Sequence, residues 1–583
     1  MKTLNEHRHL RKYLYFFMSL AIAAIPINFA ATSSLTAIGV APPSTDWGGF
    51  VHDFVETDFR IDPAFAISEG RHDYDGKLPD WSDAGLQRRA DFLRSTIAKA
   101  GSFTGLTPEQ TFERDYLIAV AKGQLFWLTD ADSPHTNPAF YLGGGLDPAT
   151  YTSRPYADAT TRLKAMIAYM KAVPTAISQA RANLRTPMPR SFINYGVTAF
   201  GNLADYYVRD GKAAFASVKD PVRQAEYDAA AKPAAAAMKS FADWLTANRK
   251  TATETGYAMG AARFSRMLAA TELVDVPLDR LEAVGRADLA RNQAALKAAC
   301  ARYAPGATIK ECMAKAAADK PVDGPVAEAR RQVPMLHAFV VEHDLVTLPG
   351  TEQVLVAKAP PYNSQTAAYM DPPGPFDKGV PSIYYIAPPD PRWSKAQQAA
   401  YVLSKGNLLF ITVHEVMPGH FVQFLQSNRS ASEIGRLFVG YAYAEGWAHY
   451  CEQMMWDAGL SNGDPEMHIG QLSEALLRDV RFLSAIGLHA RGMTEDESRR
   501  MFLDDAYQDE GNAEQQARRG TYDPAYLNYT LGKLMITKLR EDWTATRGGH
   551  TAWKPFHDAF LAFGGPPIPL IRRVMLGDAS PAL

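Results

Sequence analysis

The chain has 583 residues, of which 47% are hydrophobic, 21% charged and 11% aromatic, a composition typical of a globular protein. Its 61 lysines and arginines nearly balance its 63 aspartates and glutamates, and the net charge of −2 argues against a nucleic-acid or polyanion binder. The same values exclude disorder across the body of the chain.

The first thirty residues differ from the rest of the chain. A basic start, MKTLNEHRHLRK, precedes the apolar run YLYFFMSLAIAAI, and small residues follow near Ala30 and Ala31. This order is typical of a secretory signal peptide, and the run is short for a membrane span, although an uncleaved anchor is the alternative. No cysteine follows the run closely, which argues against a lipoprotein. We predict a signal peptide over residues 1–30, a linker over residues 31–46, and a periplasmic or secreted protein with no stable membrane insertion after cleavage.

The body of the chain shows mostly helical periodicity over residues 47–393, without an internal repeat. A segment rich in proline and glycine, residues 360–391, contains one short β-like run, SIYYIA. A lone strand beside a catalytic helix could hold an extended substrate by β-augmentation, and a structural crossover is the alternative. We predict a large, mainly α protein with a central cleft and little β-sheet. It forms one domain, residues 47–583, whose second part begins at residue 394.

Two of the three cysteines lie close together. Cys300 and Cys312 flank a Pro-Gly turn in CARYAPGATIKEC. In an oxidising compartment we expect a disulfide that closes this small loop, with two buried free thiols as the alternative. Cys451 remains, and we interpret it as a small core residue.

Four helices are expected in the second part of the chain. Their expected bounds are from Ser394 through the motif HEVMPGH, 433–457 with an end at Gly459, from Asp464-Pro465 to near Gly492, and a start at Thr494, which forms a capping box with Glu497.

The motif HEVMPGH begins at His414 and ends at His420, and it resembles the zinc-protease motif H-E-x-x-H with two added residues. On a regular helix, residue i+6 lies about 120° from residue i, so His414 and His420 could not bind one metal ion. Pro418 and Gly419 are the residue types that most readily break helical register, and a break could return His420 to the face of His414. The alternative is a helix that simply ends at Met417.

A later segment, YAYAEGWAHYCEQ, supplies a carboxylate at Glu445. A zinc site with two histidines needs a third protein ligand, and a carboxylate from a following helix is a common one. Gly446 would let two backbones approach closely beside it. His449 and Glu452 lie roughly on the face of Glu445, and either could fix the tautomer of a histidine ligand. The two segments together favour one bound Zn2+ per chain.

The segments HEVMPGH, EGWAHYCEQ, RFLSAIGLH and DPAYLNYTLGKL together resemble a large bacterial family of unknown function placed among gluzincin-type zinc metallopeptidases. The resemblance covers nearly the whole mature chain. It implies His414, His420 and Glu445 as zinc ligands and Glu415 as the catalytic base. The chemistry agrees, because three protein ligands leave a position for water, and Glu415 could accept a proton from it.

Further candidates match recurring positions of that family. Tyr529 and His489 could donate hydrogen bonds to an oxyanion, and Tyr526 is a weaker alternative to Tyr529 near the substrate. Arg481 could clamp a substrate carboxylate or pair with Glu452. A core tyrosine, and a histidine held at a helix C-terminus, are the structural alternatives.

We therefore predict an exported zinc metallopeptidase that hydrolyses peptide bonds, and the resemblance implies short peptides. The alternatives are a zinc hydrolase of non-peptide amides or esters and a secreted binding protein with a vestigial site. A reader of the C-terminal carboxylate would need a dedicated cation, and Arg478, Arg481 and Lys533 all qualify on sequence. The sequence leaves exopeptidase versus oligopeptidase activity and the oligomeric state open.

Overall fold

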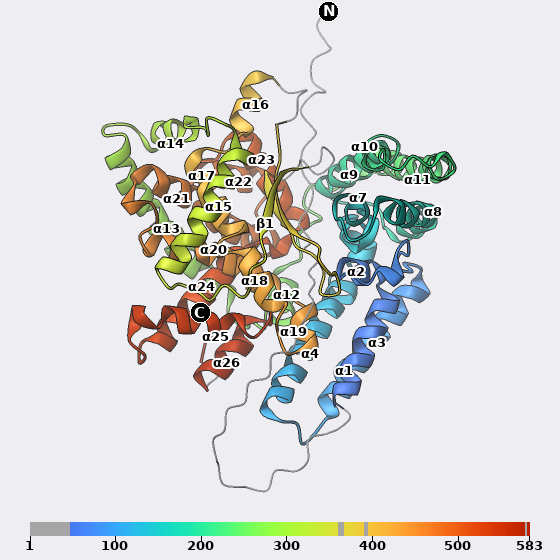
Figure 1. The fold of residues 1–583 in the computed structure, drawn as a ribbon, viewed down its shortest axis with the longest axis horizontal. Helices are drawn as coiled ribbons and strands as arrows, with labels where there is room; N and C mark the ends of the chain where they lie inside the picture. Colours follow the sequence, from blue (N-terminus) through green and yellow to red (C-terminus); the bar gives the residue numbers. More distant parts are fainter. Residues whose placement is uncertain (1–46, 360–366, 390–393, 578–579) are drawn as a thin grey trace, which may run out of the picture.

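The computed structural model describes residues 47–359, 367–389, 394–577 and 580–583 (Figure 1). Helices account for 71% of the structure, which confirms the mainly α prediction. The predicted signal peptide and linker, residues 1–46, lie outside the described residues, as does part of the segment rich in proline and glycine.

The helices of the N-terminal half are α1 (Trp47–Ile61), α2 (Pro63–Ser68), α3 (Asp83–Ser102), α4 (Pro108–Leu125), α5 (Ser133–Thr136), α6 (Ala139–Tyr141), α7 (Ala149–Ser153), α8 (Ala159–Asn183), α9 (Arg190–Val208), α10 (Asp210–Ala214) and α11 (Pro221–Ala247). Those of the C-terminal half are α12 (Ala261–Thr271), α13 (Leu278–Tyr303), α14 (Ile309–Ala318), α15 (Pro325–Glu342), α16 (Lys395–Tyr401), α17 (Lys405–Glu415), α18 (His420–Ser427), α19 (Glu433–Leu437), α20 (Tyr441–Asp457), α21 (Pro465–Ala490), α22 (Glu495–Asp504), α23 (Glu510–Tyr522), α24 (Asn528–Thr544), α25 (Trp553–Leu561) and α26 (Ile568–Leu576).

Buried apolar side chains form two large clusters that divide the chain near residue 250. Helices α1 to α11 build the first, which also receives Leu437 of α19 and Leu570 of α26. Helices from α12 onward build the second. Figure 1 shows α1–α11 on one side of the molecule and most later helices on the other. The division expected at residue 393 falls inside the second cluster, because α13 packs along α21.

A three-stranded sheet accompanies the second half, where the sequence predicted a lone strand. Its strands are β1 (Val354–Lys358), β2 (Ala368–Asp371) and β3 (Ser382–Ile386), in the order β1-β3-β2. The predicted run SIYYIA forms β3, which is buried throughout and lies parallel to β1 and antiparallel to β2. In the described part of the chain, β2 is therefore an edge strand. β1 and β2 are short and partly exposed, so their sequences lack the buried pattern that marks β3.

Two of the four expected helices are interrupted. The helix predicted from Ser394 through the motif is two helices, α16 and α17, because Ser404 adopts an extended conformation and caps α17 through the Asn407 amide. The helix predicted over 433–457 is also two, α19 and α20. Between them the Gly440 amide donates to the Gly565 carbonyl at 2.7 Å, a tertiary contact that competes with helix continuation.

The other two helices have the predicted starts. Asp464 caps α21 through the Glu466 amide, and Thr494 forms the expected capping box of α22 with Glu497. Both caps are local, which explains why the sequence alone shows them.

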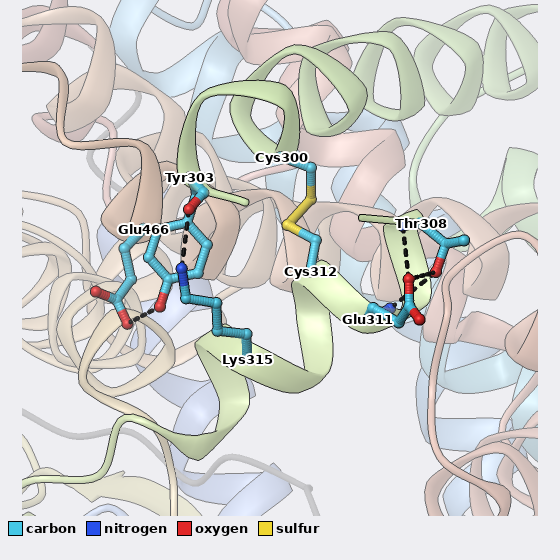
Figure 2. Close-up of a disulfide and its surroundings, with 7 residues drawn as sticks. All are labelled: Cys300, Tyr303, Thr308, Glu311, Cys312, Lys315 and Glu466. Atoms are coloured by element: carbon cyan, nitrogen blue, oxygen red, sulfur yellow. Dashed lines mark hydrogen bonds between the residues drawn. A yellow bond between two sulfur atoms is a disulfide. The ribbon is translucent and has the colours of Figure 1, made fainter. Parts of the chain in front are cut away.

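The structure joins Cys300 at the end of α13 to Cys312 in α14 through a disulfide (Figure 2). The loop between them is also held by the Thr308–Glu311 capping box of α14. A hydrogen bond from Lys315 Nζ to the Tyr303 carbonyl, 3.0 Å long, crosses the same junction. Together these contacts fix α14 against α13.

One described segment, Lys405–Ser427, is long and apolar enough to cross a membrane by length and composition. Its most apolar window is 94% buried inside the protein, as expected for a core segment. This segment contains the motif HEVMPGH.

Candidate metal centre

A backbone break inside the motif brings its two histidines together. Helix α17 ends at Glu415 and α18 begins at His420, so the segment between them leaves the helical path. The Gly419 amide donates to the Val413 carbonyl at 3.0 Å. A Cβ on Gly419 would lie 1.8 Å from the His414 carbonyl oxygen, so this approach requires glycine. The ring centroids of the two histidines lie 4.8 Å apart.

Glu445 of α20 completes a buried group with the two histidines. Its Oε2 atom lies 3.2 Å from His414 Nε2 and 3.4 Å from His420 Nε2. Tetrahedral zinc with bonds of about 2.0–2.1 Å places its ligand atoms about 3.3–3.4 Å apart. The observed separations therefore match those of two ligand pairs around one zinc ion.

The hydrogen bonding of these residues fits a cation as well. His420 is fully buried, yet neither of its ring nitrogens has a hydrogen-bond partner among the described residues. Glu445 Oε1 is likewise buried without such a partner. Buried polar atoms are normally paired, and a cation bound beside His414 Nε2 would satisfy His420 Nε2 and Glu445 Oε1, since each histidine offers a metal ion one ring nitrogen.

Glu452 orients His414 through the ring nitrogen that does not face Glu445. Its Oε1 atom lies 2.7 Å from His414 Nδ1, which directs Nε2 toward Glu445. Burial opposes ionisation of Glu452, but the Arg478 guanidinium, 3.3 Å away, and the contacts with His414 and His449 together outweigh it and hold the pKa of Glu452 below its ordinary value. His449 lies 3.4 Å from the other oxygen of Glu452, and burial lowers its pKa to about 3, so it is neutral. Of the two residues expected to fix a ligand tautomer, Glu452 is the one that contacts His414.

Glu415 follows His414 directly in the chain and lines a cavity that His414 and Glu445 also line. Its Oε2 atom accepts a hydrogen bond from the Met370 amide of β2 at 3.0 Å. Burial raises the pKa of Glu415, as is useful for a group that exchanges protons near neutral pH. The edge strand therefore holds the predicted base in place.

Close packing of two helices brings Tyr529 to the same site. A Cβ on Gly446 of α20 would lie only 2.5 Å from Gly532 Cα of α24, so the two helices can approach this closely because both residues are glycine. This is the close backbone approach that the sequence predicted at Gly446. Tyr529, one turn before Gly532, stacks 6.3 Å from the His414 ring. Burial raises the pKa of Tyr529, so its phenol stays protonated and can donate a hydrogen bond.

His489 and Tyr526 do not reach the site, which contradicts the roles predicted for them. His489 Nε2 donates to the Gly520 carbonyl at 2.7 Å, its ring stacks on Phe264, and burial lowers its pKa to about 4. Tyr526 donates to Ser484 Oγ at 2.8 Å. Neither residue lines the cavity, because their helical positions turn them into the core.

Arg481 lines the cavity but does not pair with Glu452. Arg478, which precedes it by one helical turn, makes that pair instead. Arg481 donates through Nε to Gln516 Oε1 at 2.8 Å. Its guanidinium carbon lies 4.9 Å from the centre of the Tyr529 ring.

The cavity has a volume of about 2010 Å³ and is lined by both halves of the protein. Its C-terminal wall includes His414, Glu415 and Glu445, and its N-terminal wall includes Trp127 and Tyr195. Small-molecule sites usually measure about 300–1,000 Å³. The predicted central cleft is present and is large enough for several residues of peptide.

The sequence did not indicate three contributors to this site. The Met370 amide has no local signal, because only the fold brings β2 to α17. Arg519 donates to the Tyr441 hydroxyl at 3.0 Å, and both line the cavity near Tyr529. Tyr441 precedes Glu445 by four residues, so its place on the same helix face was available as a signal.

Comparison with known proteins identifies the family. The family model described as "Bacterial protein of unknown function (DUF885)" matches residues 63–575, and the chain belongs to this family. A solved structure of a candidate lipoprotein of unknown function from Shewanella oneidensis is 24% identical, with a TM-score of 0.73 over 91% of this chain and 100% of that chain. Another, of a candidate lipoprotein from Colwellia psychrerythraea, is 17% identical, with a TM-score of 0.77 over 91% and 98%. These likenesses establish the fold alone, and no curated protein matches the chain.

Proposed function

We propose that this protein is a zinc-dependent metallopeptidase of the gluzincin type. The observation that carries the proposal is the buried group of His414, His420 and Glu445, whose ligand atoms lie at zinc-like separations beside Glu415. Two histidines and one carboxylate form a donor set typical of catalytic zinc, which keeps a further position for water or substrate. The intact set also argues against a vestigial site.

The residues around His414, His420 and Glu445 each have a separate role in peptide hydrolysis. Bound zinc would supply Lewis acidity and bring the pKa of a bound water toward about 7. Glu415 accepts a proton from the attacking water and returns it to the leaving amine. The Met370 amide fixes the orientation of Glu415 for this transfer. Tyr529 donates to the oxyanion that develops on the substrate carbonyl.

Two features favour a peptide over a smaller amide or ester. The cavity is larger than most small-molecule sites. All four residues of the edge strand β2 line it, and an extended peptide can pair with such a strand by β-augmentation. The Met370 amide of β2 donates to Glu415, so a peptide lying along β2 would lie beside Glu415.

We also propose that the protein is exported. Its disulfide between Cys300 and Cys312 fits an oxidising compartment, in agreement with the signal peptide predicted over residues 1–30.

Digestion of a peptide mixture by the zinc-loaded protein, followed by mass spectrometry, tests the function. We expect cleavage that a chelator abolishes, that added zinc restores, and that the Glu415→Gln variant lacks. The matched control is Glu541→Gln, which removes an exposed carboxylate of α24. A zinc-loaded parent that leaves all peptides intact but hydrolyses esters or simple amides would replace the peptidase proposal with the alternative hydrolase.

A further inference from the structure

We infer that Arg481 binds the C-terminal carboxylate of the substrate, so that the enzyme shortens peptides from their C-terminal ends. This inference rests on the proposed peptidase function and specifies its substrate class.

Arg481 is a buried cation without a counter-ion. Its side chain lies on α21 and lines the cavity, and the residue is only 8% exposed. Its one hydrogen bond among the described residues goes from Nε to the neutral amide of Gln516. No described carboxylate lies within ion-pair distance of its guanidinium group. Burying an unpaired charge is costly, and a carboxylate ligand would offset that cost.

The neighbouring arginines already have partners. Arg478 pairs with Glu452 at 3.3 Å and with Glu474 at 2.9 Å. Arg519 pairs with Asp523 at 2.9 Å. Both guanidinium groups lie near the Tyr529 ring, so they add to the positive potential around Arg481 without being free to bind an anion.

Lys533, the third cation that the sequence offered as a carboxylate reader, is excluded by its position. It donates to Asp288 Oδ2 at 2.6 Å and does not line the cavity. Of the three sequence candidates, only Arg481 faces the cavity with its charge unmatched.

The geometry also limits the length of peptide released. The Arg481 guanidinium carbon lies 4.9 Å from the Tyr529 ring centre, which lies 6.3 Å from the His414 ring centre. The sum of these distances places Arg481 within about 11 Å of the His414 ring. An extended peptide advances about 3.3 Å per residue, so at most about three residues fit between the cleaved bond and the carboxylate.

The guanidinium group suits this role chemically. Its planar fork matches the two oxygens of a carboxylate, and Gln516 fixes its plane through Nε. The two terminal nitrogens have no hydrogen-bond partner among the described residues, which leaves a bidentate contact available. A C-terminal amide cannot match the positive charge.

Decapeptides of mixed sequence test the inference when each is made in three forms: a free acid, a C-terminal amide, and an amide with one glutamate near that end. We expect the zinc-loaded parent to shorten the free acids by one to three residues and to cut both amides about 100-fold more slowly. Arg481→Gln should lower kcat/KM for the free acids about 100-fold and so abolish the preference for free acids over amides. Arg481→Lys, which keeps the positive charge but loses the planar fork, should have a kcat/KM for the free acids between those of the parent and Arg481→Gln.

The control variant is Arg491→Gln, at the end of the same helix, where the arginine pairs with Glu282 outside the cavity. It should behave as the parent does. Binding of the free acids and amides to the Glu415→Gln variant should show the same preference without turnover.

Two results would overturn the inference and leave the peptidase proposal intact. The parent could cleave free acids and amides equally well, or a folded, zinc-bound Arg481→Gln variant could keep the preference for free acids. Efficient, Arg481-dependent cleavage of the glutamate-containing amide would also overturn it, because Arg481 would then bind an acidic side chain. A parent that binds zinc but cleaves no peptide in any form would instead refute the proposed function itself.

Discussion

Gly419→Ala should separate zinc binding from folding. The added Cβ would lie 1.8 Å from the His414 carbonyl oxygen and 2.5 Å from the Val413 carbonyl oxygen, where real Cβ atoms stay beyond 3.0 Å. The backbone between His414 and His420 must therefore shift by about 1.2 Å, the difference between the closest contact and that limit. Zinc–ligand distances tolerate about 0.2 Å, so the shift is about six times what the site accepts. We expect zinc affinity to fall at least 100-fold.

Competition with a chromogenic zinc chelator measures this affinity, and far-UV circular dichroism checks that the helices persist. The control is Gly101→Ala in α3, where nothing lies within 4 Å of an added Cβ. That variant should bind zinc as the parent does. If Gly419→Ala also bound zinc at parental affinity, the break in the motif would not set the ligand geometry.

Three further predictions follow from the same structure. Glu452→Gln should weaken zinc binding about 10- to 100-fold in the same competition assay, because His414 Nδ1 loses its charged acceptor; an unchanged affinity would remove Glu452 from the site. Tyr529→Phe should lower kcat for peptides about 100-fold with little change in KM, and a change in KM alone would show a role in substrate binding only. Burial disfavours protonated His72, but its contacts with Asp377 and Asp75 together outweigh burial and raise the His72 pKa above 6.5. The contribution of charged His72 to the free energy of unfolding should be present below pH 6.5 and be lost as the pH rises through that raised pKa. The free energies of unfolding of the parent and His72→Gln, measured by urea titration, should therefore converge at alkaline pH. A difference that stays constant with pH would contradict this.

The sequence predicted those parts of the fold that local contacts decide. The starts of α21 and α22 follow from Asp464 and Thr494, whose side chains cap amides two or three residues ahead. The break before α20 depends on Gly440 meeting Gly565, which lies far away in the chain. No local pattern marks such a contact, so the sequence suggested one continuous helix.

The same distinction explains the site. The meeting of His414, His420 and Glu445 was predictable because the motif and Glu445 indicate it by their residue types and spacing. The position of His489 could not be predicted, because it depends on which face of α21 packs against the core. Arg478 and Arg481 are one turn apart and both line the cavity, and only the structure shows that Arg478 is the one that pairs with Glu452.

Metal content is the most direct test of the central claim. Elemental analysis of the purified, zinc-loaded protein should find about one zinc ion per chain, as the three-ligand set requires. His420→Ala and Glu445→Ala should retain helical circular dichroism and lose nearly all of that zinc. A folded parent protein that cannot be loaded with zinc would contradict the account and leave a binding protein as the better description.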